Sequence, residues 1–296
     1  MMIFLAAGLA LCLAAPARAK ESLAPSAGTP ATASGYNQKI LRDHPVLFLA
    51  MDTPGRGVQI DLSGHGRNGA YKGGIPRLAT LPNGDKTADF NGSSEYVTVR
   101  SAAALSVPTS GAITIEAWIR PDTLQFPHTE AGNYVYFLGK GNSANGYEYA
   151  NRMYSLKNPV GRPNRISVYA WDPAGGLGSG SYFEDAVTAG DWIMVTDVID
   201  MKDTSPQYPT GYISIYKNGV LRQKVPLTMY HVIPKATDAP FNIGSRNFNS
   251  WFKGAVGKVA VYNHVLSDAQ IISHYAAMWD VQLRHLLHPP ILQDRP

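Results

Sequence analysis

Tyrosine, tryptophan, asparagine and arginine residues gather in a few segments of this sequence and could together bind a carbohydrate. The segment 142–154, which we expect to be a loop, is the richest, and segments 171–183 and 247–251 add further aromatic rings. The C–H faces of a sugar stack on aromatic rings, while its hydroxyl groups form hydrogen bonds with polar side chains. We therefore predict carbohydrate contacts from Tyr147, Tyr149, Asn151, Arg152, Trp171, Tyr182 and Trp251. Because aromatic residues at strand ends also pack in protein cores, any single one of these residues can have a structural role instead.

The sequence patterns of common enzyme classes are missing from this chain. Glycoside hydrolases place two carboxylates around the scissile bond. Here Glu116 has no acidic companion in its expected strand, and the neighbours Glu184 and Asp185 would point to opposite faces of a strand. The sequence has no H-x-x-x-H pair for zinc, no Gly-x-Ser-x-Gly nucleophile motif and no phosphate-binding loop. We therefore predict that the protein is not an enzyme.

Short strands joined by turns are the elements that must position these residues. Ala112–Arg120 alternates, with isoleucine and alanine on one face and mainly polar residues on the other. Tyr212–Val225 reads as a hairpin, because Asn218-Gly219 supplies the two positive-φ positions of a tight turn. One helix follows near the C-terminus, where Ser267 and Gln270 form a capping box. This spacing of strands predicts an all-β antiparallel sandwich or barrel with one short C-terminal helix.

The composition supports a folded, β-rich protein. Of the 296 residues, 45% are hydrophobic and only 16% are charged, which argues against disorder. The 28 glycines and 21 prolines supply turns. The net charge of +4 is not concentrated in any run of lysine or arginine, so we do not expect a nucleic acid partner.

The first residues read as a targeting signal. Residues 1–15 are apolar and uncharged, and Ala17-Arg18-Ala19 is a cleavage signature, so residues 1–19 are expected to be a signal peptide. Cleavage would remove the single cysteine, Cys12, and leave no integral membrane segment in the mature chain. Residues 20–36 read as a flexible linker, 37–278 as one domain and 279–296 as a C-terminal tail. We therefore expect a secreted, periplasmic or extracellular protein.

Six segments, in order, resemble the LamG-like jelly-roll domain of the concanavalin A-like lectin/glucanase superfamily. They are DLSGHGRNG (61–69), ADFNGSSEYVTV (88–99), ITIEAWIRP (113–121), DWIMV (191–195), ISIYKNGVL (213–221) and FKGAVGKVAVYNHVLSDAQI (252–271). The resemblance covers residues 45–278. It implies two antiparallel sheets of about six or seven strands each, packed face to face in a concanavalin A-like jelly-roll sandwich.

The resemblance also implies a calcium site, because members of this family often hold calcium at the early loop. Asp61 and Asn68 could supply side-chain ligands there, and Asp52, which ends the first strand, could supply another. The chain has Gly257-Lys258 where the family usually has an acidic pair, which would weaken such a site. The alternative is that Asp61 only stabilises a turn.

Taken together, the sequence predicts an exported, non-catalytic, lectin-like module that binds a poly- or oligosaccharide, with calcium as a possible aid. An extracellular protein-interaction or adhesion module, with a cell-surface protein as partner, is the alternative. A third hypothesis is that the protein is a polysaccharide hydrolase or lyase. Related lyases use arginine, histidine, tyrosine and glutamine together, and here His128 and Tyr134 lie near one another in sequence without a recognisable motif.

Overall fold

Two antiparallel sheets make up the fold in the computed structural model, which describes residues 34–172 and 176–280. The first sheet has the order β14-β13-β12-β7-β16-β5-β4, with β1 also paired to β16. Its strands are β1 (Leu47–Leu49), β4 (Arg77–Thr80), β5 (Lys86–Asn91), β7 (Ala112–Pro121), β12 (Ile193–Asp200), β13 (Tyr212–Lys217), β14 (Val220–Pro226) and β16 (Lys253–Tyr262). The fold is therefore the concanavalin A-like antiparallel sandwich that the sequence predicts.

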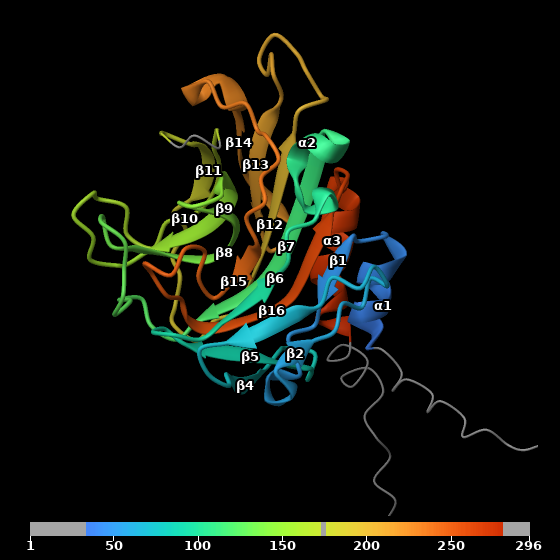
Figure 1. Cartoon of the computed structure of the whole chain (residues 1–296), viewed down its shortest axis with the longest axis vertical. Helices are drawn as coiled ribbons and strands as arrows, with labels where there is room; N and C mark the ends of the chain where they lie inside the picture. The colour runs from blue at the N-terminus through green and yellow to red at the C-terminus, as the bar shows by residue number, and fades with distance from the viewer. Residues whose placement is uncertain (1–33, 173–175, 281–296) are drawn as a thin grey trace, which may run out of the picture. The chain divides into compact units, whose positions relative to one another are not determined.

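The second sheet has the order β11-β10-β9-β8-β15-β6-β3-β2. Its strands are β2 (Val58–Gln59), β3 (Gly69–Lys72), β6 (Tyr96–Val99), β8 (Tyr134–Asn142), β9 (Gly146–Tyr154), β10 (Ile166–Ala170), β11 (Ser179–Phe183) and β15 (Phe241–Ile243). Each sheet thus has eight strands in the described part of the chain, slightly more than expected. Strands β8 to β11 lie together at one side of the view in Figure 1.

Short helices connect or cover the strands. They are α1 (Gly35–Arg42), α2 (Val107–Ser110) and α3 (Asp268–Ala277), with the 3₁₀ turns η1 (Pro54–Arg56), η2 (Ala103–Leu105) and η3 (Leu227–Tyr230). The capping box of Ser267 and Gln270 is present at the start of α3, so the expected C-terminal helix is confirmed. Helix α1 was not expected, and it lies against α3 (Figure 1). No helix in the described ranges is long and apolar enough to span a membrane.

The alternation of β7 places one of its faces in the core between the sheets. Ile113, Ile115 and Ile119 are buried there. The opposite face is buried as well, because Trp118 packs in a second apolar cluster with residues of α1 and α3. A strand that is covered on both sides explains why Ala112–Arg120 exposes almost nothing to water.

The turn of the β13–β14 hairpin follows the sequence signal. Asn218 and Gly219 have φ values of 53° and 82°, the left-handed conformations that a two-residue hairpin turn requires. The side chain of Asn218 also accepts a hydrogen bond from the backbone N–H of Met194. Local chemistry is therefore enough to determine this turn.

The folded domain is slightly longer at both ends than the range 37–278. Tyr36 is 1% exposed and accepts a hydrogen bond from the indole N–H of Trp118, so residues 34–36 are not part of a flexible linker. Trp279, which we assigned to the tail, packs against Trp118 and Tyr275. The expected signal peptide (1–19), the rest of the linker and residues 281–296 of the tail lie outside the described residues.

Candidate functional site

A cavity of about 820 Å³ lies on the face of β8–β11 that points away from the core. We call it the groove. One rim includes η3 and the segment 176–178, and Arg246 reaches it from the loop between β15 and β16. Most of the lining side chains are aromatic or arginine: Tyr134, Tyr136, Tyr147, Tyr169, Trp171, Tyr182, Tyr230, Arg152, Arg162, Arg165 and Arg246. Its size and composition are those of a small-ligand site.

The alternation of side chains along β10 places two aromatic residues in the groove. Tyr169 and Trp171 are two residues apart on and just after β10, so they share a face, and their rings stack with centroids 5.5 Å apart. The intervening Ala170 points into the core. Gly180 on β11 pairs with Tyr169, and a Cβ there would lie 2.5 Å from the Tyr169 ring. Glycine at this position lets the tyrosine ring lie flat over the neighbouring strand.

Segment 142–154 is largely a strand, not the loop that we expected, and a β-bulge in it separates two tyrosines. Lys140 pairs with Tyr149 and Gly141 pairs with Tyr147, so Glu148 is an extra residue on β9. The bulge shifts the alternation by one position. As a result Tyr147 lines the groove, while Tyr149 is fully buried in the core.

Two residues that we predicted to contact a carbohydrate therefore lie inside the sandwich. The hydroxyl of Tyr149 donates a hydrogen bond to the carbonyl of Leu105 at 2.7 Å. The amide of Asn151 donates to the carboxyl group of Asp197 at 2.6 Å, and both side chains are buried. Burial raises the pKa of Asp197 well above its ordinary value. These side chains support the strand but do not reach the groove.

Trp251 also lies outside the groove. It packs against Tyr96 and Phe248, with ring centroids 6.0 Å and 5.9 Å away. Of the seven predicted residues, the structure thus brings four together: Tyr147, Arg152, Trp171 and Tyr182.

Sequence reasoning missed several residues of the groove. Tyr169 could have been found, because it shares the parity of Trp171 in the strand 165–171 that the sequence already indicated. Tyr136 could likewise have been paired with Tyr134 by its two-residue spacing. Arg246 follows a three-residue strand in an irregular loop and carries no local signal.

Guanidinium groups stack on the aromatic rings of the groove. The guanidinium of Arg152 lies 3.9 Å from the ring centroid of Tyr169 and 4.4 Å from that of Tyr134. Arg246 lies 4.0 Å from the centroid of Tyr136 and 4.6 Å from that of Tyr147. Cation–π contacts of this kind hold the arginines in place and leave their N–H groups available as donors.

Paired carboxylates, which a glycoside hydrolase needs, do not occur in this part of the structure. None of the described residues that line the groove is aspartate or glutamate. Those residues also include no histidine, although they include arginine, tyrosine and glutamine, the other residue types that related lyases use.

The Asp61 carboxylate, predicted as a calcium ligand, already has protein partners on both oxygens. Oδ1 accepts hydrogen bonds from the backbone N–H of Phe48 and from both the N–H and the hydroxyl of Ser63. Oδ2 accepts one from the N–H of Arg67. The side chain of Asn68 accepts a hydrogen bond from the N–H of Asp61. These contacts close the turn after the first strand.

Asp52, the third predicted ligand, has a protein partner on one carboxylate oxygen. Oδ1 of Asp52 accepts a hydrogen bond from the Gln59 amide at 3.0 Å. Within the described ranges, no three His, Cys, Asp or Glu side chains are grouped as metal ligands. Both carboxylate oxygens of Asp61, the amide oxygen of Asn68 and one oxygen of Asp52 thus already accept hydrogen bonds, and the residues fit the ion poorly. Calcium binding stays a prediction.

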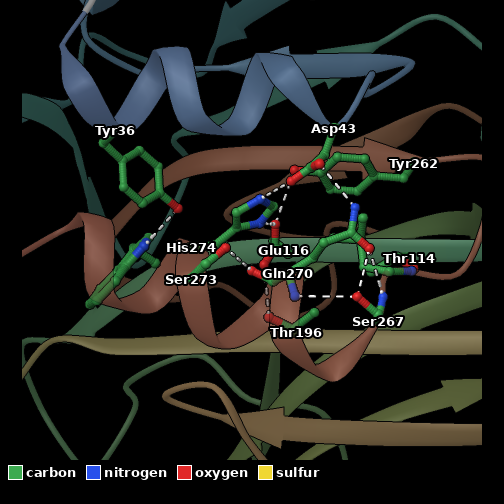
Figure 2. Close-up of polar contacts among 12 residues, drawn as sticks. Tyr36, Asp43, Thr114, Glu116, Thr196, Tyr262, Ser267, Gln270, Ser273 and His274 are labelled. Carbon is green, nitrogen blue, oxygen red and sulfur yellow. Dashed lines mark hydrogen bonds and ion pairs between the residues drawn. The ribbon is translucent and has the colours of Figure 1, made fainter.

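A second polar cluster lies between the first sheet and the helices α1 and α3, as Figure 2 shows. Glu116 of β7, fully buried, accepts hydrogen bonds from Thr196 and Tyr262. Its Oε2 lies 2.7 Å from Nδ1 of His274 in α3, whose Nε2 lies 2.6 Å from Oδ2 of Asp43. This cluster links β7, α3 and the end of α1. It is an arrangement that holds helices to a sheet.

The titration of His274 reflects its two carboxylate neighbours. Burial by itself lowers the pKa of this imidazole, but the charges and hydrogen bonds of Glu116 and Asp43 outweigh it, so the pKa is raised above its ordinary value. Because a carboxylate only accepts hydrogen bonds, both ring nitrogens of His274 must donate, which requires the imidazolium form. None of these residues lines the groove.

Comparison with known proteins agrees with the fold. The model of the concanavalin A-like lectin/glucanases superfamily matches residues 91–272. No curated protein matches the sequence. Among solved structures, the ligand binding domain of botulinum neurotoxin serotype D in complex with N-acetylneuraminic acid is 15% identical, with a TM-score of 0.56, and covers 82% of this chain and 52% of its own.

Two further structures are similar to the same extent. The binding domain of botulinum neurotoxin DC in complex with SialylT is 14% identical, with a TM-score of 0.56, and covers 80% of this chain and 52% of its own. The receptor binding domain of botulinum neurotoxin type G is 15% identical, with a TM-score of 0.54, and covers 79% and 51%. The chain thus spans about half the length of the structures it matches. At this identity the likeness concerns the fold, and the matched structures are binding domains.

Proposed function

We propose that this chain, which belongs to the concanavalin A-like lectin/glucanases superfamily, is a non-catalytic carbohydrate-binding module whose ligand lies in the groove. The observation that carries the proposal is the convergence of seven aromatic rings and four arginines around one cavity of about 820 Å³. Aromatic faces suit the C–H surfaces of sugars, and fixed polar groups beside them suit the hydroxyls. The chain would act outside the cytoplasm, as its expected signal peptide implies.

Likeness to other binding domains gives limited support. Two of the matched neurotoxin structures are complexes, one with N-acetylneuraminic acid and one with SialylT. Since this chain spans about half of each, the place of those ligands is not transferred to it. The proposal rests on the groove itself, and a fold of this kind hosts several functions.

A binding screen of the full chain on a glycan array tests the proposal. Tyr147→Ala and Tyr182→Ala each remove a half-buried ring from the groove, and each is expected to weaken binding about three- to ten-fold. Phe248→Ala removes a ring that is 43% exposed and lies outside the groove, so it is the matched control and should bind like the wild type. Absence of binding to every glycan would refute the proposal and favour a protein partner.

Two further measurements test whether calcium assists binding and whether the protein is an enzyme. Repeating the screen in calcium and in EDTA tests calcium assistance: binding lost in EDTA would support it, and unchanged binding would remove calcium from the mechanism. Incubation of the bound glycan with the protein, followed by analysis for cleaved products, tests catalysis. Glycan recovered intact agrees with the proposal, whereas unsaturated or hydrolysed products would show an enzyme.

A further inference from the structure

The arginines of the groove differ in how their charges are balanced. Arg165 forms an ion pair with Glu184 at 2.6 Å, and Arg162 donates a hydrogen bond to the hydroxyl of Tyr154. Within residues 34–172 and 176–280, neither Arg152 nor Arg246 has a carboxylate within ion-pair distance. Two positive charges of the groove are therefore left without a direct counter-charge in the protein.

Parts of both guanidinium groups are also shielded from water. Arg246 is only 5% exposed, and Nε of both Arg152 and Arg246 is buried without a hydrogen-bond partner. Burial lowers the pKa of Arg246, and Tyr136, Tyr147 and then the charge of Glu130 act in the opposite direction. A guanidinium keeps its proton even so. Burying an uncompensated charge is costly, and a bound anion would offset that cost.

Each of the two guanidinium groups is stacked on a tyrosine ring of the groove, and these two rings are neighbours. Arg152 stacks on Tyr134 and Arg246 on Tyr136, and the centroids of these two rings are 5.5 Å apart. A planar guanidinium with free N–H groups matches the paired oxygens of a carboxylate or sulfate. Because the rings already fix both side chains, little conformational entropy remains to be lost on binding.

We propose that the groove selects acidic sugars, and that Arg152 and Arg246 bind the carboxylate or sulfate group of the ligand. This inference rests on the proposed function and narrows it to a class of ligand. The aromatic rings would contact the sugar ring, while the two arginines would contact its charged substituent. Neutral glycans of the same size would then bind much more weakly.

The test uses the full chain on an array of sialylated, uronate-containing and sulfated glycans, each beside its desialylated, carboxyl-reduced or desulfated counterpart. We expect each acidic glycan that binds to do so at least about ten-fold more tightly than its uncharged counterpart. The three kinds of acidic glycan distinguish a carboxylate ligand from a sulfate ligand. Affinity should also fall as ionic strength rises.

Substitutions test whether the preference for acidic glycans depends on Arg152 and Arg246. Arg152→Gln and Arg246→Gln should each reduce the preference for the acidic member of a pair about ten-fold, and Arg246→Lys should retain part of it. Arg222→Gln loses the same charge at a position outside the groove and is the matched control. Thermal unfolding of each variant identifies any that fail to fold.

The outcomes separate this inference from the proposed function. Equal binding of acidic and neutral members, or binding confined to neutral glycans, would overturn the inference and leave carbohydrate binding intact. A preference that survives in folded Arg152→Gln and Arg246→Gln variants would also overturn it. No binding to any glycan would overturn both.

Discussion

Replacing Glu116 by glutamine tests whether the buried cluster between the sheet and the helices depends on charge. Glu116 is fully buried and lies 2.7 Å from His274, whose other ring nitrogen lies 2.6 Å from Asp43. Glutamine preserves the shape of the side chain but removes one of the two negative charges. Removing one partner of a buried ion pair costs about 3–5 kcal/mol. Because glutamine can still accept a hydrogen bond, we expect about 3 kcal/mol at the lower end of that range.

The cost of Glu116→Gln should depend on pH. The folded protein raises the pKa of His274, so this group stabilises the fold fully below its unfolded pKa of about 6.5, and the contribution is lost as pH rises through the folded pKa. We therefore expect the full cost at about pH 5, below the unfolded pKa, and a smaller cost at about pH 9, falling toward the about 1 kcal/mol of a neutral hydrogen bond as His274 loses its proton. Urea unfolding of the wild type and the variant at both pH values measures the difference.

Tyr262→Phe is the control for this experiment. It removes only the phenol that donates to Glu116 at 3.1 Å, and burial raises the pKa of that phenol well above its ordinary value. Its cost should thus be about 1 kcal/mol at both pH values. If Glu116→Gln cost the same at the two pH values, or less than the control, His274 would not be charged in the folded protein and the reasoning would be wrong.

Three further changes test other parts of the structure. Gly180→Ala would place a Cβ 2.5 Å from the ring of Tyr169, so it should displace that ring and weaken glycan binding about ten-fold, while circular dichroism remains that of the wild type. Burial, followed by the charge of Asp122, raises the pKa of Asp89 to about 6, so protonation stabilises the fold as pH falls below that value. In urea unfolding, the wild type should therefore gain about 2 kcal/mol relative to Asp89→Asn between about pH 7 and pH 4, and parallel curves would contradict this. Ser267→Ala removes the N-cap of α3 and should cost about 1 kcal/mol in the same assay, with no effect on glycan binding.

Features that depend on neighbouring residues could be predicted well from the sequence. The alternation of Ala112–Arg120, the turn at Asn218-Gly219 and the cap at Ser267 are all present in the structure. Each of these signals needs only the backbone geometry of a few consecutive residues. Together with the ordered family motifs, they were sufficient to predict the antiparallel sandwich.

The candidate site was predicted only in part, and for Tyr149 the reason is a single extra residue that changes which side chain faces outward. The sequence analysis placed Tyr147 and Tyr149 in one ligand-binding loop, but the bulge at Glu148 in strand β9 directs the first to the groove and the second to the core. A bulge depends on the pairing of β9 with β8, which no local pattern in the sequence revealed.

The sequence by itself determined that short alternating strands form two packed sheets, and it indicated the segments from which aromatic residues would come. Only the tertiary structure decided that Arg246 from a distant loop would join Arg152 over adjacent tyrosine rings, and that Glu116 would meet His274 beneath the helices. Hydrogen bonds within turns and caps join residues close in the chain, so the sequence displays them directly. Glu116 and His274 are 158 positions apart in the chain and Asp43 and His274 are 231 apart, so only the packing of the sheets and helices brings them together, and the same packing brings Arg246 to the groove.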